Sequence, residues 1–111
     1  MNPDKTFVTK LGTTRAGERT RIWLEGSRLV AHGFTCGHMF LKTWEDGRLI
    51  LTLHTGGALT AGRSSLGTVS GKGDKPIIDI TGARVAELFG TGTHVTVTYR
   101  AGRITITTQE A

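Results

Sequence analysis

The stretch IWLEGSRLVAHGFTCGHMFLKTWEDGRLILTL, from Ile22 to Leu53, decides the expected fold because it recurs in shorter form as IDITGARVAELFGTGTHVTVTYRAGRITIT, from Ile78 to Thr107. Each copy has an apolar strand, a glycine, a short amphipathic helix, a phenylalanine, a second glycine, a strand, a Gly-Arg turn and a closing strand. Matches at glycines and core-type positions in one order predict an internal duplication, with one residue deleted near the end of the second helix. The matched pairs are Gly26 and Gly82, Arg28 and Arg84, Leu29 and Val85, Phe34 and Phe89, Gly37 and Gly92, Gly47 and Gly102, and Arg48 and Arg103.

The first copy also carries motifs of a known family. Its LEG, GF-x-x-G and DG-x-L-I-L signatures, between Ile22 and Leu51, resemble the SymE-type toxin family. Both copies are more distantly similar to the AbrB/SpoVT/MazE swapped-hairpin family, and the two copies make up somewhat over half of the chain. The resemblance implies a mainly β fold with two short helices, built as a tandem-duplicated swapped-hairpin β-barrel with pseudo-two-fold symmetry. It brings no catalytic signature, so it bears on fold more than on function.

The duplication divides the chain into three parts. Residues 1–54 form the first repeat, with an N-terminal strand and a basic arm; residues 55–66, rich in Gly, Ser and Thr, form a linker; and residues 67–111 form the second repeat. Pieces of about 50 residues bury too little surface to be stable alone, so both repeats are expected to share one core. Each hairpin should cover the other copy, which predicts a monomeric pseudo-dimer or a homodimer.

Two local signals are specific. Ser27 is the expected cap of a short helix, Arg28 to His32, and Phe34 should fold back over Leu29 and Val30 after the glycine that stops this helix. Asp46-Gly47 predicts a two-residue hairpin turn, because both central positions of such a turn need positive φ. The other expected strands are Thr6–Lys10, Arg21–Glu25, Ile77–Ile80, His94–Tyr99 and Arg103–Thr108, and the second helix is Ala83–Leu88.

Composition limits the class of protein. The 111 residues hold 14 Lys and Arg against 9 Asp and Glu, a net charge of +5, which indicates a polyanionic partner or simply a basic surface. The single Cys36 excludes an intrachain disulfide and fits a reducing compartment. No apolar run is long enough for a membrane helix, and the polar start is unlike a signal peptide, so a cytoplasmic protein without a membrane partner is expected.

The strongest functional pattern is a basic arm in each copy. The AbrB-like resemblance implies that the arms lie on one side of the pseudo-dimer and present arginines to nucleic acid, most simply duplex DNA. The resulting prediction is a small regulatory or antitoxin-like DNA-binding protein that acts in transcription regulation or a toxin-antitoxin system. The alternative reading of the same residues is a solvated loop face without a ligand. The predicted nucleic-acid-binding residues are Lys10, Arg15, Arg19, Arg21, Arg28, Lys72, Lys75 and Arg84.

Two other function classes remain open. The SymE resemblance implies an RNA-cleaving toxin, in which His32 or His38 would act with Arg28. A protein-binding inhibitor from a mobile element is the third class. The histidine spacing matches no zinc signature and no acid or nucleophile constellation is evident, so no metal, cofactor or catalytic residue is assigned and a non-enzymatic role is favoured. Aromatic rings beside arginines can stack on unpaired bases, but Trp44 and Tyr99 match across the copies, which favours a symmetric contact in the core or between the lobes. Trp23 is the aromatic expected to be exposed.

Overall fold

The computed structural model describes residues 5–13, 20–45, 47–54, 64–89 and 94–108. Within these ranges the chain forms two β-sheets and two short helices, which confirms the predicted mainly β class. The strands are β1 (Lys5–Lys10), β2 (Gly12–Thr13), β3 (Thr20–Glu25), β4 (Met39–Glu45), β5 (Arg48–Leu53), β6 (Ser64–Thr68), β7 (Ser70–Lys72), β8 (Lys75–Thr81), β9 (His94–Arg100) and β10 (Arg103–Thr108), and the helices are α1 (Ser27–Ala31) and α2 (Ala83–Phe89).

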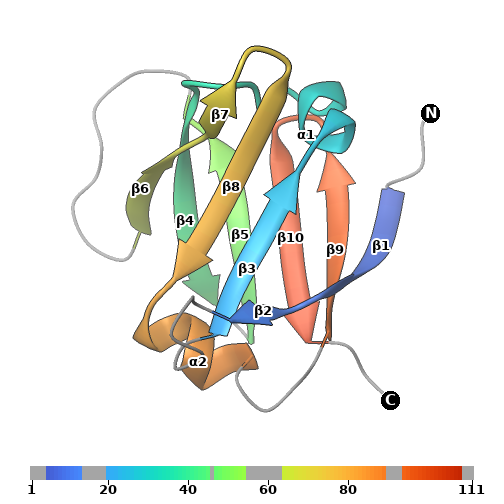
Figure 1. Cartoon of the computed structure of the whole chain (residues 1–111). Coiled ribbons are helices and arrows are strands. Elements are labelled where there is room, and N and C mark those ends of the chain that lie inside the picture. The colour runs from blue at the N-terminus through green and yellow to red at the C-terminus, as the bar shows by residue number, and fades with distance from the viewer. Residues whose placement is uncertain (1–4, 14–19, 46, 55–63, 90–93, 109–111) are drawn as a thin grey trace.

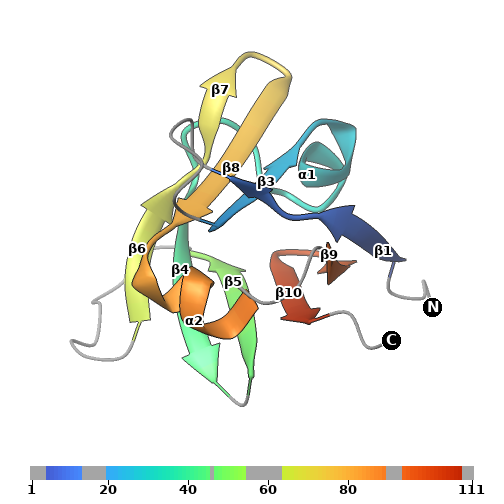
Figure 2. The same cartoon turned by 60° about the horizontal axis from the view of Figure 1, so that its bottom comes forward.

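The two sheets lie face to face as two layers. The six-stranded sheet has the order β1-β9-β10-β5-β4-β6, and the four-stranded sheet has the order β2-β3-β8-β7. In Figure 1 the four-stranded sheet lies in front of the six-stranded sheet, and α1 and α2 lie at opposite ends of the molecule. Figure 2 shows the same layers after rotation. Apart from Ile50, the buried apolar residues form one core cluster, to which both sheets and both helices contribute.

The strand order is symmetric between the two halves of the chain. If each strand of the first half (β1–β5) is exchanged with its counterpart in the second half (β6–β10), each sheet keeps the same strand order, now read from its opposite edge. The pairing of β3 with β8 is centred on Trp23 opposite Asp79, and that of β5 with β10 on Ile50 opposite Thr105. Most of the buried residues also occupy matching positions in the two halves. These pairs are Leu11 and Val69, Ile22 and Ile78, Leu24 and Ile80, Leu29 and Val85, Phe34 and Phe89, Phe40 and Val95, Leu49 and Ile104, and Leu51 and Ile106.

The expectation of a closed barrel is wrong, because the sheets keep separate edges. Only Leu11 separates β1 from β2, and only Val69 separates β6 from β7. Strands β1 and β6 belong to the six-stranded sheet, and β2 and β7, which follow the buried Leu11 and Val69, belong to the four-stranded sheet. The chain itself therefore crosses between the layers at both sides, and no continuous ladder of hydrogen bonds closes the sheets into a barrel.

Helix α1 is closed as the glycine and the phenylalanine predict. Gly33 has φ 91°, its N–H donates to the Val30 carbonyl at 3.1 Å, and the Phe34 N–H donates to the Leu29 carbonyl at 2.8 Å, which is a Schellman motif. Leu29 and Phe34 are fully buried, but Val30 is 40% exposed, so the expected cover of Val30 is wrong. Ser27 lies inside the helix and caps nothing; Gly26, with φ 95°, occupies the cap position.

The β4–β5 hairpin forms at the predicted place, and strand β6 extends into the predicted linker. Glu45 pairs with Arg48 and Gly47 has φ 74°, which confirms the two-residue connection, although Asp46 lies outside the described residues. Strand β6 begins at Ser64, inside the predicted linker, because residues 64–68 pair with β4. Residues 55–63 lie outside the described residues.

Candidate nucleic-acid interface

The predicted basic residues lie in several different places. Arg15 and Arg19 fall in residues 14–19, outside the described residues. Lys10 is exposed at the end of β1, where it is paired with His94 across the edge of the six-stranded sheet. The other five come from β3, the two helices and the turn between β7 and β8, and each of these groups has different neighbours.

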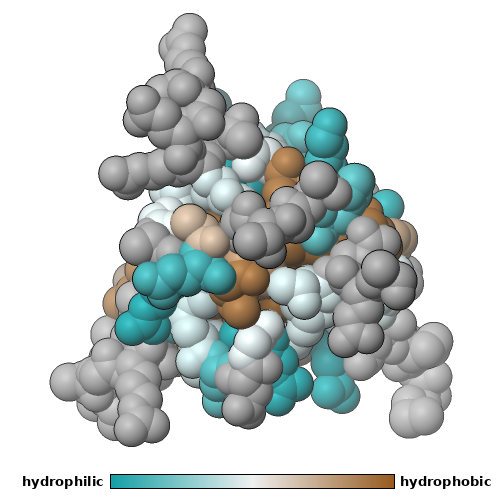
Figure 3. Space-filling model, turned by 90° about the horizontal axis from the view of Figure 1, so that it is seen from below, coloured by the Kyte–Doolittle hydropathy of each residue, from teal (hydrophilic) through white to brown (hydrophobic). Residues whose placement is uncertain are grey.

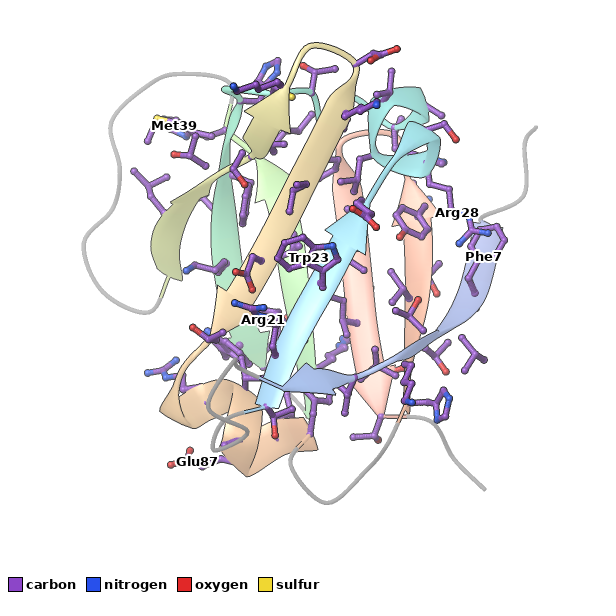
Figure 4. The ribbon with its side chains drawn as sticks, in the orientation of Figure 1. Phe7, Arg21, Trp23, Arg28, Met39 and Glu87 are labelled. Carbon is purple, nitrogen blue, oxygen red and sulfur yellow. The ribbon has the colours of Figure 1, made fainter. Side chains whose placement is uncertain are left out.

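Arg21 lies in the middle of the molecule and is held by an acid from the other half of the chain. Its Nε is 3.0 Å from Asp79 Oδ1, and its guanidinium lies 5.2 Å from the centre of the Trp23 ring. This Nε is buried and makes an ion pair rather than an aligned hydrogen bond. Figure 4 shows Arg21 and Trp23 together in front of the four-stranded sheet, and Trp23 is 37% exposed, as predicted. Asp79 balances the charge of Arg21, so this arginine is a weak candidate for a phosphate contact.

Three segments carrying cations meet around α1. The Gly26 N–H donates to the Pro76 carbonyl at 3.2 Å, which links the start of α1 to β8, and the Gly102 N–H donates to the His32 carbonyl at 2.8 Å, which links the end of α1 to the β9–β10 turn. Figure 1 shows these elements at the same end of the molecule. We call this surface the α1 end; its basic residues are Arg28, Lys72, Lys75, Arg100 and Arg103.

The α1 end includes cations that sequence reasoning missed. Arg100 and Arg103 face each other across the β9–β10 turn, as Lys72 and Lys75 do across the β7–β8 turn. The Gly-Arg turn of the repeat contains Arg103 and was a signal for this surface, but only the fold joins this turn to the end of α1. The acidic residues of the same segments are Glu25 and Asp74.

Arg28 is anchored by an aromatic cluster. Its guanidinium carbon lies 3.5 Å from the centre of the Phe7 ring (Figure 4). Phe7 in turn lies edge-on to Tyr99, with a distance of 5.9 Å between the ring centroids. The His32 ring also packs against Tyr99, with a distance of 5.3 Å between the ring centroids. Burial raises the pKa of Tyr99, and the nearby Arg28 charge partly opposes this shift. The cluster fixes the position of a cation at the surface before any ligand binds.

The histidines of the ribonuclease alternative have different partners. The His32 Nδ1 is 2.6 Å from the Arg28 carbonyl oxygen, and because a carbonyl only accepts, Nδ1 donates this bond. His38 bonds instead to the Thr35 hydroxyl at 3.0 Å. No group of three or more potential metal ligands occurs in the part of the chain that the structure describes. In the same residues no helix is long and apolar enough to cross a membrane.

Arg84 lies at the opposite end of the molecule, beside acidic residues. It is on α2, and with the β4–β5 hairpin this helix borders a shallow, open groove of about 470 Å³. We call it the α2 groove; Trp44, Glu45 and Arg48 from the hairpin and Arg84, Glu87 and Leu88 from the helix line it. Figure 3 views the molecule from this end and shows hydrophobic surface beside hydrophilic side chains. Arg84 therefore belongs to a different surface from Arg28.

Comparisons of this chain with protein-family models, with curated proteins and with solved structures find no match. The resemblance to the SymE and AbrB-like families therefore stays a hypothesis that rests on the motifs of the sequence. The function has to be argued from the distribution of charges and from the local chemistry of each surface.

Proposed function

We propose that this protein binds duplex DNA as a small regulatory or antitoxin-like protein and that the α1 end is its main contact surface. One observation carries the proposal: the three segments that meet at α1 carry five cations against two carboxylates. Phosphate contacts supply most of the affinity of a protein for DNA, and a local excess of Lys and Arg is the usual form of such a surface.

Arg28 is the side chain best prepared for a phosphate contact. Its guanidinium packs on the Phe7 ring, so the side chain has already lost part of the conformational entropy that an arginine loses when it binds a ligand. A guanidinium binds phosphate oxygens through two parallel hydrogen bonds, which lysine does not do. The lysines of the β7–β8 turn and the arginines of the β9–β10 turn belong to segments that are hydrogen-bonded to the two ends of α1, and they would contact further phosphates.

The symmetric strand order supports the AbrB-like part of the proposal. Strand β1 of the first half pairs with β9 of the second, and β6 of the second half pairs with β4 of the first. We interpret this exchange as the result of duplicating a swapped-hairpin unit, so that one chain holds the equivalent of a dimer. The two ends of this pseudo-dimer are unequal, because Arg100 at the α1 end matches Glu45 at the α2 end. DNA is therefore expected at one end rather than symmetrically at both.

The proposal is tested by fluorescence anisotropy of a labelled duplex at several salt concentrations, with RNA as competitor. The double variant Lys72→Met/Lys75→Met removes two charges and keeps the apolar stems. It is expected to weaken binding and to reduce the slope of log K against log salt by about one for each phosphate that the variant no longer neutralises. Arg28→Met is expected to weaken binding in the same way.

The matched control for Arg28→Met is Lys42→Met, which also removes one positive charge but from β4, away from the α1 end. This variant should bind the duplex as the unchanged protein does. Equal weakening by the control would show a general charge effect and contradict the assignment of the surface. No binding at low salt would overturn the DNA proposal in favour of a protein partner, and displacement of the duplex by equimolar RNA would favour an RNA ligand.

A further inference from the structure

The α2 groove is lined by an aromatic ring, two cations and two carboxylates. Trp44 supplies a half-buried aromatic ring, Arg48 and Arg84 supply two cations, and Glu45 and Glu87 supply two carboxylates. The volume of about 470 Å³ lies within the range of about 300–1,000 Å³ that small-molecule sites occupy. The groove lies at the end of the molecule away from α1, so it is separate from the proposed DNA-contact surface.

Aromatic side chains close the place at the other end of the molecule that matches the groove. There, Tyr99 matches Trp44 and is only 3% exposed, since Phe7 and His32 pack against it. The position on β6 that matches Phe7 is Ser65, which pairs with Lys42 as Phe7 pairs with Val97. The position that matches His32 is Leu88, and it lines the groove. The ring of Tyr99 is therefore covered, whereas the matching ring of Trp44 is accessible from the groove.

The arrangement of charges indicates the chemistry of a ligand. Each wall of the groove has one arginine and one glutamate: Glu45 and Arg48 are cross-strand partners on the hairpin, and Arg84 and Glu87 are three residues apart on α2. An aromatic ring stacks on a nucleobase, and arginine binds phosphate oxygens. An ionised carboxylate only accepts hydrogen bonds, so it selects a base edge that offers donors. Guanine alone offers two adjacent donors, N1–H and the N2 amino group, on its pairing edge.

We propose that the α2 groove binds a guanine nucleotide, either free or as an unpaired residue of a strand. The base stacks on Trp44, and a carboxylate of the groove accepts hydrogen bonds from N1 and N2. Arg48 and Arg84 hold the phosphate. Adenine and cytosine each present a ring nitrogen acceptor where guanine has N1–H, and this acceptor would face the carboxylate and weaken their binding.

The test uses the tryptophan at the site as its own reporter. The chain has two tryptophans, so Trp23→Phe leaves Trp44 as the only one, and its fluorescence is followed as GMP, AMP, CMP, guanosine or ribose 5-phosphate is added. GMP is expected to quench the signal saturably and to bind about tenfold more tightly than AMP, CMP or guanosine, a difference typical of one charge-assisted hydrogen bond. Isothermal titration of the unchanged protein with GMP provides a second readout that needs no substitution.

Variants of exposed residues separate the two halves of the recognition. Arg84→Met should weaken GMP binding by about tenfold and leave guanosine binding unchanged, because guanosine has no phosphate. Glu45→Gln/Glu87→Gln should lower the affinity for GMP to that for AMP. Arg84 and Glu87 are exposed on α2, so thermal unfolding of these variants is expected to match that of the unchanged protein.

Two outcomes of these titrations would contradict the guanine-binding proposal. Absence of saturable GMP binding in both readouts, or equal binding of GMP, AMP and ribose 5-phosphate, contradicts a guanine site. A single-stranded tetranucleotide with one guanine distinguishes the two sources: tighter binding than GMP indicates a strand, and equal binding indicates a free nucleotide. The result is independent of the DNA proposal, because Lys72→Met/Lys75→Met should weaken duplex binding while GMP binding stays unchanged.

Discussion

Two glycines of the β7–β8 hairpin have left-handed backbone conformations for different reasons. Gly71 has φ 99°, and a Cβ atom placed on it would overlap the backbone carbonyl oxygen of Lys75 on the paired strand. Gly73 has φ 59° in the turn, and a Cβ atom there would meet open space. The first position excludes a side chain both by φ and by close approach, and the second only by φ.

Gly71→Ala is expected to destabilise the protein by about 3 kcal/mol, since it adds a backbone collision to the strain of a positive φ. Gly73→Ala, the matched control two residues away, should cost only about 1 kcal/mol. Thermal unfolding followed by circular dichroism measures both. Equal losses of stability in the two variants would show that the close approach to Lys75 has no energetic effect.

Residue-scale contacts also explain why the candidate surface was only partly predictable. Arg21 belongs to a run of basic residues in the sequence, yet Asp79 balances its charge because antiparallel pairing of β3 with β8 places Trp23 opposite Asp79 and Arg21 within reach of it. Arg100 and Arg103 are distant from this run, but they border a turn whose Gly102 is hydrogen-bonded to His32 at the end of α1. Sequence spacing measures proximity along the chain, and charge balance depends on contacts between distant segments.

At the scale of elements, α1 is a helix that packing maintains. It has five residues, well below the length of about 12–15 at which an isolated helix becomes marginally stable in water. The Schellman bonds at Gly33 and Phe34 close its end, and the Leu29 and Phe34 side chains insert completely into the core. The sequence predicted this closure because a glycine after an amphipathic turn can adopt the left-handed conformation that ends a helix, and the large apolar residue after it can then pack back onto the last turn.

Phe34→Ala is therefore expected to cost about 3–5 kcal/mol, as for other fully buried phenylalanines. A protein of this size has about 5–15 kcal/mol in total, so this variant should be close to unfolding. Val30→Ala, on the exposed side of the same helix, should cost less than about 1 kcal/mol. Urea unfolding curves give both values, and a destabilisation by Val30→Ala as large as that by Phe34→Ala would contradict the packing described for α1.

At the scale of the whole molecule, the two halves of the chain complete each other. Strand β1 pairs with β9 and strand β6 with β4, so each half supplies an edge strand of the six-stranded sheet to the other half. The central pairs, β3 with β8 and β5 with β10, also join the two halves. Apart from the β4–β5 and β9–β10 hairpins and the short β2–β3 and β7–β8 pairings, every strand pairing in the described part of the chain therefore joins the two halves.

Residues 1–54 produced alone should not fold, because β1 and β3 would be without their partners β9 and β8 and the apolar side of the hairpin would be uncovered. Circular dichroism is expected to show no cooperative thermal transition for this fragment, whereas the whole chain should unfold in one step. Sedimentation at low concentration should find the whole chain near its monomer mass of 11.9 kDa. Cooperative unfolding of a monomeric fragment would contradict the shared core.

The sequence alone determined the order and type of most elements, the two hairpin turns and the glycine closure of α1, because each of these depends on residues a few positions apart. The tertiary structure decided that the sheets stay open, since the change of partner at Leu11 and Val69 depends on strands from the other half. It also decided which cations share a surface and which aromatic ring is covered. Those properties arise from contacts between distant segments, which local spacing does not encode.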